Sequence, residues 1–129
     1  MITTKSVYSP IDKKRDGFRV LVSRFRGRGL PKSAYDAWVP SLGPSEKLLK
    51  SFLGGGLTWA AFQKEYRAEL LSESPVDKKN RVIKNHGQKF TLRLLAGLGK
   101  RGTVTLMCQC SETEPQCHRR ILKKLIETI

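Results

Sequence analysis

The sequence predicts an α/β fold, with a mostly parallel sheet flanked by helices in a Rossmann-like three-layer arrangement. Two segments, 18–23 and 103–108, are rich in apolar and β-branched residues and have the composition of buried strands. Helical periodicity lies between and after them, which favours parallel strands joined by right-handed crossovers. The chain has 129 residues, and we expect residues 1–129 to form one domain.

The first half of the chain contributes a further strand and a capped helix. Residues 2–8 have the pattern of a short strand, and a polar turn follows them. Ser45, after Pro44, can cap a short helix that runs to Phe52, and the three glycines at 54–56 end it. These glycines lack the lysine and the spacing of a phosphate-binding loop, so we interpret them as a helix stop.

Three more helices are predicted in the second half. Thr58 caps the first, and its apolar side chains recur at helical spacing as Trp59, Phe62, Tyr66 and Leu70. We expect this stripe to be buried, since a base-stacking platform needs exposed rings. The pattern is ambiguous from about 75 to 95, with a helix expected at 90–98. Segment 119–129 is amphipathic and predicts a terminal helix.

The chain is strongly basic. It has 25 Lys and Arg against 11 Asp and Glu, a formal net charge of +14. Such a field attracts nucleic acid, phosphorylated metabolites or anionic surfaces, although a basic host proteome would give the same balance. Because the basic residues are spread along the chain, a dedicated nucleic-acid arm is disfavoured.

Two classes of location are disfavoured by the apolar pattern. No apolar run approaches the roughly 20 residues that cross a bilayer, and the first residues lack the apolar region of a secretory signal. We therefore expect a cytoplasmic protein with no membrane partner. No cofactor-binding motif is present, and no cofactor is expected.

An arginine-rich loop follows the predicted central strand. Arg24, Arg26 and Arg28 alternate there with Gly27 and Gly29, which let the backbone approach a bound group closely. In open α/β sheets, ligands bind at the carboxyl ends of central strands, so this loop is a candidate anion site. The alternative is an ordinary solvated loop.

A cysteine-containing loop joins the second strand to the terminal helix. All three cysteines lie within 108–117, too close together for the framework of a disulfide-stapled secreted domain. Cys117 and His118 stand at the start of the helix, where the helix dipole and Arg119 favour a thiolate. The sequence thus predicts Cys117 as an accessible thiol of low pKa, with His118 beside it, and Cys108 as a buried, inert residue.

Three chemistries are compatible with this loop. Cys117 could attack an electrophile or exchange disulfides with Cys108 or Cys110, and Cys110 is its natural resolving partner. Zinc could bind to Cys108, Cys110, Cys117 and His118, although the spacing is irregular and adjacent residues rarely both reach one ion. Arg119, the helix start and the arginine loop could instead hold an anion without covalent chemistry.

Several stretches also carry a resemblance to a known family. The most specific is 16–24, and the similarity continues through Arg28-Gly29, Trp38, Pro44-Ser45, Leu48 and Phe52 to 62–70. Segment 106–122 looks like the strand, cysteine, acidic loop and Cys-His-Arg that precede a final helix in the wider family. On these residues, about three quarters of the chain resembles the YeaO-like proteins of domain of unknown function 488 (DUF488).

The resemblance implies a shared pocket and no particular reaction. By similarity, seven residues are candidates to meet in it: Arg24, Arg28, Ser45, Tyr66, Cys117, His118 and Arg119. The chain departs from the family at two places. Arg26-Gly27 replaces a usual Trp-Pro, and Ser23 replaces a usual Asp, so a role for the carboxylate of that Asp does not carry over. YeaO-type members often lack the cysteines, so a cysteine mechanism is not universal among them.

The leading hypothesis is binding of a small anion or phosphate compound, with thiol chemistry at Cys117. In the first alternative, the chain binds or processes nucleic acid and the same arginines contact phosphates. In the second, zinc supports the structure of the domain.

Overall fold

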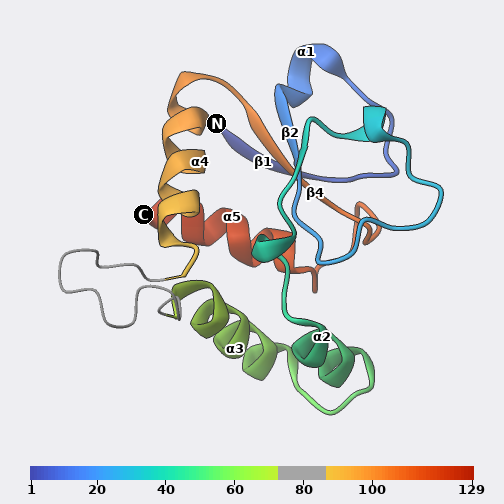
Figure 1. The fold of residues 1–129 in the computed structure, drawn as a ribbon, viewed down its shortest axis with the longest axis vertical. Helices are drawn as coiled ribbons and strands as arrows, with labels where there is room; N and C mark the ends of the chain where they lie inside the picture. Colours follow the sequence, from blue (N-terminus) through green and yellow to red (C-terminus); the bar gives the residue numbers. More distant parts are fainter. Residues whose placement is uncertain (73–86) are drawn as a thin grey trace.

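The computed structural model describes residues 1–72 and 87–129 (Figure 1). Its elements in chain order are β1 (Ile2–Ser6), α1 (Lys13–Asp16), β2 (Phe18–Leu21), η1 (Lys32–Ala34), β3 (Ala37–Trp38), η2 (Pro40–Leu42), α2 (Glu46–Leu53), α3 (Trp59–Leu71), α4 (Lys89–Arg101), β4 (Val104–Cys108) and α5 (His118–Thr128), where η marks a 3-10 turn. The stretch 75–86, for which the sequence favoured no element, lies outside the described residues.

The four strands form one parallel sheet in the order β1-β4-β2-β3. Both long strand predictions, 18–23 and 103–108, become the two inner strands, β2 and β4. Val104 of β4 is paired with β1 on one side and with β2 on the other. The α/β class and the parallel sheet predicted from the sequence are confirmed.

Alternation along β4 divides its side chains between two faces of the sheet. Val104 and Leu106 join the larger hydrophobic core, together with Leu122 of α5. Met107 instead joins a smaller cluster on the other face, with Leu21 of β2. Cys108, the last residue of β4, lies two residues after Leu106, so its side chain points to the same face, which α5 covers.

Helices cover the two faces of the sheet unequally. Helix α5 packs on β1 and β4, with α4 beside it, while α2 and α3 pair with each other next to this layer (Figure 1). The smaller cluster includes Leu30 and Ala34, so the opposite face is covered by the arginine-rich loop and the turn η1. The outer layer on that face is therefore a loop and a single turn in place of long helices.

The predicted helix caps are confirmed. Ser45 Oγ accepts a hydrogen bond from the Leu48 N–H over 3.2 Å at the start of α2. Thr58 Oγ1 accepts one from the Ala61 N–H over 3.1 Å at the start of α3. The predicted apolar stripe of α3 is buried at Phe62, Tyr66 and Leu70, as expected of a core face.

Short elements escaped the sequence analysis. The helix α1 has four residues, and the strand β3 has two, which is too few for a periodic pattern to show.

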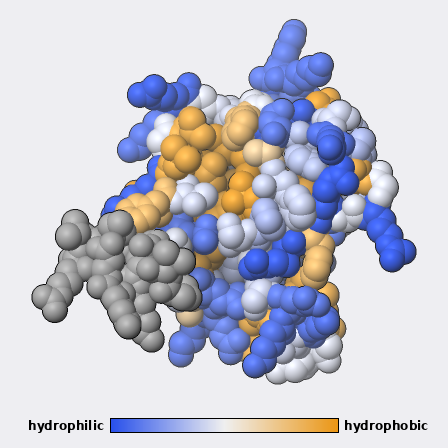
Figure 2. All heavy atoms as spheres, viewed as in Figure 1, coloured by the Kyte–Doolittle hydropathy of each residue, from blue (hydrophilic) through white to orange (hydrophobic). Residues whose placement is uncertain are grey.

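Figure 2 shows a largely hydrophilic surface on the side seen in Figure 1, interrupted by an apolar area over α4. Leu94 and Leu98 of α4 are exposed. Among the described residues, no helix has both the length and the apolar character needed to cross a bilayer.

Candidate functional site

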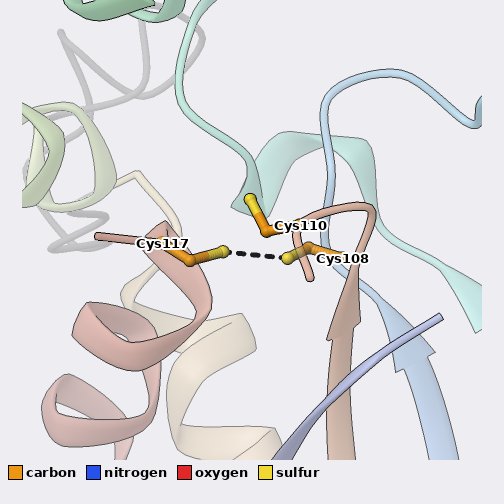
Figure 3. A group of neighbouring side chains, drawn as sticks. All are labelled: Cys108, Cys110 and Cys117. Carbon is orange, nitrogen blue, oxygen red and sulfur yellow. Dashed lines mark hydrogen bonds between the residues drawn. The ribbon is translucent and has the colours of Figure 1, made fainter. Parts of the chain in front are cut away.

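The three cysteines meet where β4 ends and α5 begins. Cys108 is the last residue of β4, and Cys117 is the N-cap of α5. Their sulfurs lie 2.9 Å apart, facing each other across the loop (Figure 3). Cys110 stands in the turn directly after the strand, and all three sulfurs lie within 4.8 Å of one another. Strand alternation and the return of the chain into α5 thus gather three thiols from ten residues of sequence.

Arg119 holds this loop together from inside. Its guanidinium has no exposed surface, and Nη1 donates to Cys108 Sγ over 2.9 Å and to the Cys110 carbonyl over 3.2 Å. Its Nη2 donates to the carbonyls of Ser111 and Glu112 over 2.8 and 3.1 Å. The arginine therefore shapes the loop and also places a positive charge against a sulfur.

The three thiols differ in pKa, and the pKa of Cys108 is the one that is lowered. Hydrogen bonds from the thiols of Cys110 and Cys117 lower the pKa of Cys108 far below its ordinary value, and the nearby charge of Arg119 contributes. The same hydrogen bond to Cys108 raises the pKa of Cys117, and the pKa of Cys110 is also raised by its bond to Cys108. These directions favour a thiolate at Cys108 over one at Cys110 or Cys117.

The expectation of an accessible, acidic Cys117 was wrong in both respects. Cys117 is 1% exposed, and its hydrogen bond to Cys108 raises its pKa. The lower pKa of Cys108 comes first from the hydrogen bonds of Cys110 and Cys117. Arg119 Nη1 contributes and lies 2.9 Å from Cys108 Sγ, against 3.8 Å from Cys117 Sγ. Cys108 is buried as expected, at 1% exposed, and its inertness stays a prediction. Of the two sulfurs predicted to exchange with Cys117, that of Cys108 lies 2.9 Å away and that of Cys110 within 4.8 Å.

His118 is held as a neutral imidazole that faces the thiols. Its Nε2 lies 2.9 Å from the Val22 carbonyl, which can only accept, so Nε2 carries the proton. Nδ1 therefore presents a lone pair, 4.0 Å from Cys117 Sγ. Burial lowers the pKa of His118, and the Tyr66 ring meets the imidazole edge to face at 5.7 Å. The histidine can accept a proton from Cys117.

A pocket of about 260 Å³ opens beside the thiols, at the carboxyl ends of β2 and β4. It is lined by Ser23, Arg24, Phe25, Pro44, Leu49, Leu53, Cys108, Gln109, Cys110 and His118. Cys117 is not part of this lining. Cys108 and Cys110 both line the pocket, Cys108 with 1% of its surface exposed and Cys110 half-buried. The walls are mostly apolar, and Arg24 is the charged residue among them.

The predicted anion-binding residues are only partly gathered at this pocket. Arg24 lines it, but its Nε and Nη2 donate to the carbonyls of Pro44 and Gly43 over 3.0 and 2.8 Å. Ser45 lines a separate hollow of about 300 Å³, which it shares with Arg24. Arg28 is exposed and lies outside the pocket lining.

Tyr66 and Arg119 also lie outside the pocket lining. Tyr66 is completely buried, and its hydroxyl donates to the Leu42 carbonyl. Arg119 is occupied by loop carbonyls and by Cys108. Both side chains support the site from behind, since neither reaches the surface where an anion would bind.

Two residues of the cysteine loop were missed by the sequence analysis. The Glu112 carboxylate accepts from the Ser6 N–H over 2.6 Å and from Ser9 Oγ over 3.0 Å, which ties the loop to the end of β1. Gln109 Nε2 donates to the Phe25 carbonyl over 3.0 Å and joins the cysteine loop to the arginine loop. The acidic character of the loop is visible in the sequence. The partners of Glu112, Ser6 and Ser9, lie 106 and 103 residues away in the chain, so only the fold reveals the contact.

The predicted zinc ligands are partly brought together. In the described part of the chain, three sulfurs lie close enough together to bind one soft metal ion, those of Cys108, Cys110 and Cys117. His118 offers Nδ1 nearby. Arg119 lies against the same sulfurs, and its positive charge opposes a second cation there while favouring a thiolate. Zinc binding remains a prediction.

Comparison with known proteins agrees with the resemblance seen in the sequence. A family model described as the active DUF488-N3 subclade, DUF488-N3a, matches residues 2–129. The uncharacterised protein YeaO of Escherichia coli K12 is 30% identical over 130 residues, which cover 99% of this chain and 98% of YeaO. No solved structure matches. The chain is therefore a YeaO-like member of the DUF488 family.

Proposed function

We propose that this protein binds a small anionic compound in the pocket beside β2 and β4, and that the Cys108–Cys117 pair performs thiol chemistry on it. The observation that carries the proposal is the position of Cys108 Sγ, 2.9 Å from both Cys117 Sγ and Arg119 Nη1. A thiolate is the nucleophilic form of cysteine. Cys108 is therefore the nucleophile, and Cys117 takes part as its hydrogen-bonded neighbour.

The pocket favours a compound that is small and only partly polar. Its volume of about 260 Å³ lies below the range of about 300 to 1,000 Å³ usual for drug-sized ligands. Phe25, Pro44 and Leu49 provide apolar walls for the body of the compound. Arg24 has no carboxylate partner among the described residues and provides the positive charge. The matching family model is described as an active subclade, which agrees with a reactive site.

A pair of alkylating reagents that differ in charge tests this proposal. Iodoacetate is an anion and iodoacetamide is neutral, while both carry the same small electrophilic carbon. Rates are measured against pH on the reduced full chain, with each labelled cysteine located by mass spectrometry. Cys108→Ser and Cys110→Ser are compared with the parent, and the metal content of the same preparation is determined.

The proposal expects labelling of Cys108 well below the pH at which free cysteine reacts, since its thiolate persists there. The ratio of the labelling rate with iodoacetate to the rate with iodoacetamide should be higher for Cys108 than for free cysteine. Arg24→Gln should bring this ratio back to the value of free cysteine. Labelling confined to Cys110, with an ordinary pH dependence and no preference for the anion, overturns the proposal. Stoichiometric metal that blocks all labelling favours the zinc alternative instead.

Nucleic-acid binding is a second candidate, supported by a basic groove elsewhere on the protein. This groove, about 440 Å³ in volume, lies where α3, α5 and the cysteine loop meet, and its lining includes Arg120, Lys123, Lys124 and Trp59. Lysines can contact phosphates there, and a partly exposed indole can stack on a base. Binding of a single-stranded oligonucleotide that weakens steeply with salt, and weakens further in Lys123→Gln with Lys124→Gln, would support this candidate. Binding that is insensitive to salt would exclude it.

A further inference from the structure

We infer that the outward face of α4 is a docking surface for an acidic amphipathic helix of a partner protein. The partner places one bulky apolar side chain over Gly97, and one carboxylate each beside Arg93 and Arg101. These residues line neither the pocket beside β2 and β4 nor the basic groove at α5. The inference therefore goes beyond the proposed function, and each of the two can fail without the other.

Helix α4 carries apolar residues on two of its faces. The face toward the core carries the buried residues Leu92, Leu95 and Gly99. Phe90, Leu94 and Leu98 recur every four residues and form a second stripe, which is exposed, with 64% of the surface of Leu94 accessible. Figure 2 shows the apolar area over this helix. Packing within the domain needs only one stripe, so the second is available to a partner.

Gly97 leaves a gap beside the exposed stripe. Outside its chain neighbours and the backbone of its own helix, no atom lies within 4 Å of the position that a Cβ would occupy there. The gap belongs to an open hollow of about 360 Å³, lined by Arg93, Leu94, Gly97, Leu98 and Arg101. Four of these residues, at positions 94, 97, 98 and 101, have the spacing of the hole that receives a side chain from a facing helix.

The two ends of the hollow are positively charged. Arg93 and Arg101 lie four residues before and after Gly97, which is about one helical turn on either side. Both are exposed, and in the described part of the chain neither forms an ion pair. Segment 89–101 contains no Asp or Glu. A partner helix with a carboxylate one turn before and one turn after its bulky side chain would match this arrangement.

The combination of charge and apolar surface selects this partner among the alternatives. A second copy of the chain would bring the same arginines and a further charge of +14 to the contact, and like charges disfavour it. Nucleic acid supplies negative charge but no apolar side chains for the stripe from Phe90 to Leu98. An acidic amphipathic helix satisfies both the stripe and the arginines, as in other helix-in-groove contacts.

A designed peptide serves as the probe for this surface. It is an alanine-rich helix of about 18 residues with an apolar stripe. The central leucine of the stripe has a glutamate four residues before it and another four residues after it. Two control peptides replace the central leucine with alanine or both glutamates with glutamine. Binding to the ¹⁵N-labelled full chain is followed by the amide chemical shifts, which measure the affinity and also locate the peptide.

Three variants of the protein separate the docking surface from general effects. Gly97→Leu fills the hollow and should weaken binding at least about tenfold. Because leucine favours a helix over glycine, this variant should be no less stable than the parent in denaturant unfolding. Arg101→Gln should weaken binding about fivefold. The adjacent Lys100→Gln is the matched control, since it removes the same charge outside the hollow and should weaken binding less than about twofold.

The proposal expects shift changes centred on α4 and weaker binding of both control peptides. It is overturned if the peptide shifts the amides of α5 instead, if Gly97→Leu binds as the parent does, or if Arg101→Gln and Lys100→Gln weaken binding equally. A dimer in sedimentation that Gly97→Leu abolishes would assign the face to a second copy instead. Binding to phosphatidylglycerol vesicles without binding of the peptide would assign it to a membrane surface and would likewise overturn the proposal.

Discussion

Arg119 donates a hydrogen bond to Cys108 Sγ over 2.9 Å, from a guanidinium that has no exposed surface. The same side chain donates to three loop carbonyls. One buried arginine thus supports the shape of the cysteine loop and contributes to the lowered pKa of its central sulfur. The loop geometry and the thiolate are therefore predicted to change together when this residue is altered.

Replacing Arg119 with Met should lower the free energy of unfolding by about 3 kcal/mol, because several loop carbonyls lose a charged donor. It should also raise the pKa of Cys108, measured by the ultraviolet absorbance of the thiolate against pH. Arg119→Lys keeps the charge without the fork of donors, so it should retain more of the thiolate than Met does. The neighbouring Arg120→Met is the matched control: it donates to loop carbonyls from a half-exposed position and should cost about 1 kcal/mol. An unchanged thiolate in Arg119→Met would contradict the role of the arginine.

His118 should make stability depend on pH on the acid side of neutrality. Burial lowers its pKa below the ordinary value of 6.5, so the unfolded chain binds a proton at higher pH than the folded protein does. The contribution is complete above pH 6.5 and is lost as pH falls toward the folded pKa, by at most about 1.4 kcal/mol per pH unit. His118→Gln, whose amide can still donate to the Val22 carbonyl, should flatten this dependence in denaturant unfolding between about pH 5 and 8. An equally steep loss of stability in the variant would count against a neutral buried imidazole.

Tyr66→Phe should destabilise the protein without altering the pocket. The hydroxyl donates to the buried Leu42 carbonyl, and loss of this bond leaves an acceptor unsatisfied, at a cost of about 1 to 2 kcal/mol in denaturant unfolding. Iodoacetate labelling of Cys108 should keep its rate and its preference over iodoacetamide. A variant of unchanged stability with a weaker preference for the anion would restore Tyr66 to the anion-binding role that the sequence suggested.

Asp16 should stabilise the fold at neutral pH and lose this effect in acid. Burial by itself raises its pKa, but hydrogen bonds from the Asp12 N–H and from Lys5 outweigh burial and lower it below 3.8. Its contribution is therefore present above the pKa of the unfolded carboxyl and lost as pH falls through the lower folded value. Asp16→Asn should cost about 1 to 2 kcal/mol at pH 7 and less in acid, measured by denaturant unfolding.

The exposed neighbour Asp12 provides the control for this experiment. Asn caps a helix as well as Asp does, so Asp12→Asn should change the free energy of unfolding little. A difference between Asp16→Asn and the parent that stays constant down to pH 2 would show that the carboxylate charge is not responsible.

The sequence predicted those parts of the fold that local interactions decide. Ser45 and Thr58 cap helices because each side chain bonds an amide three residues ahead. The strands β2 and β4 were predicted because apolar runs of this composition are stable only when both faces are covered. The single turns η1 and η2 and the two-residue strand β3 could not be predicted, since tertiary contacts rather than a repeating pattern hold them in place.

The candidate site divides in the same way. The sequence by itself determined that a helix begins near Cys117, His118 and Arg119, one loop after a strand that ends in Cys108, and it predicts thiol chemistry at this junction. Only the tertiary structure decided which sulfur has the lowered pKa, because that depends on which thiols donate to it and on its distance from Arg119 Nη1, 2.9 Å for Cys108 against 3.8 Å for Cys117. It also turned Arg119 inward and left Arg28 in solvent, since burial is set by packing among elements far apart in the chain.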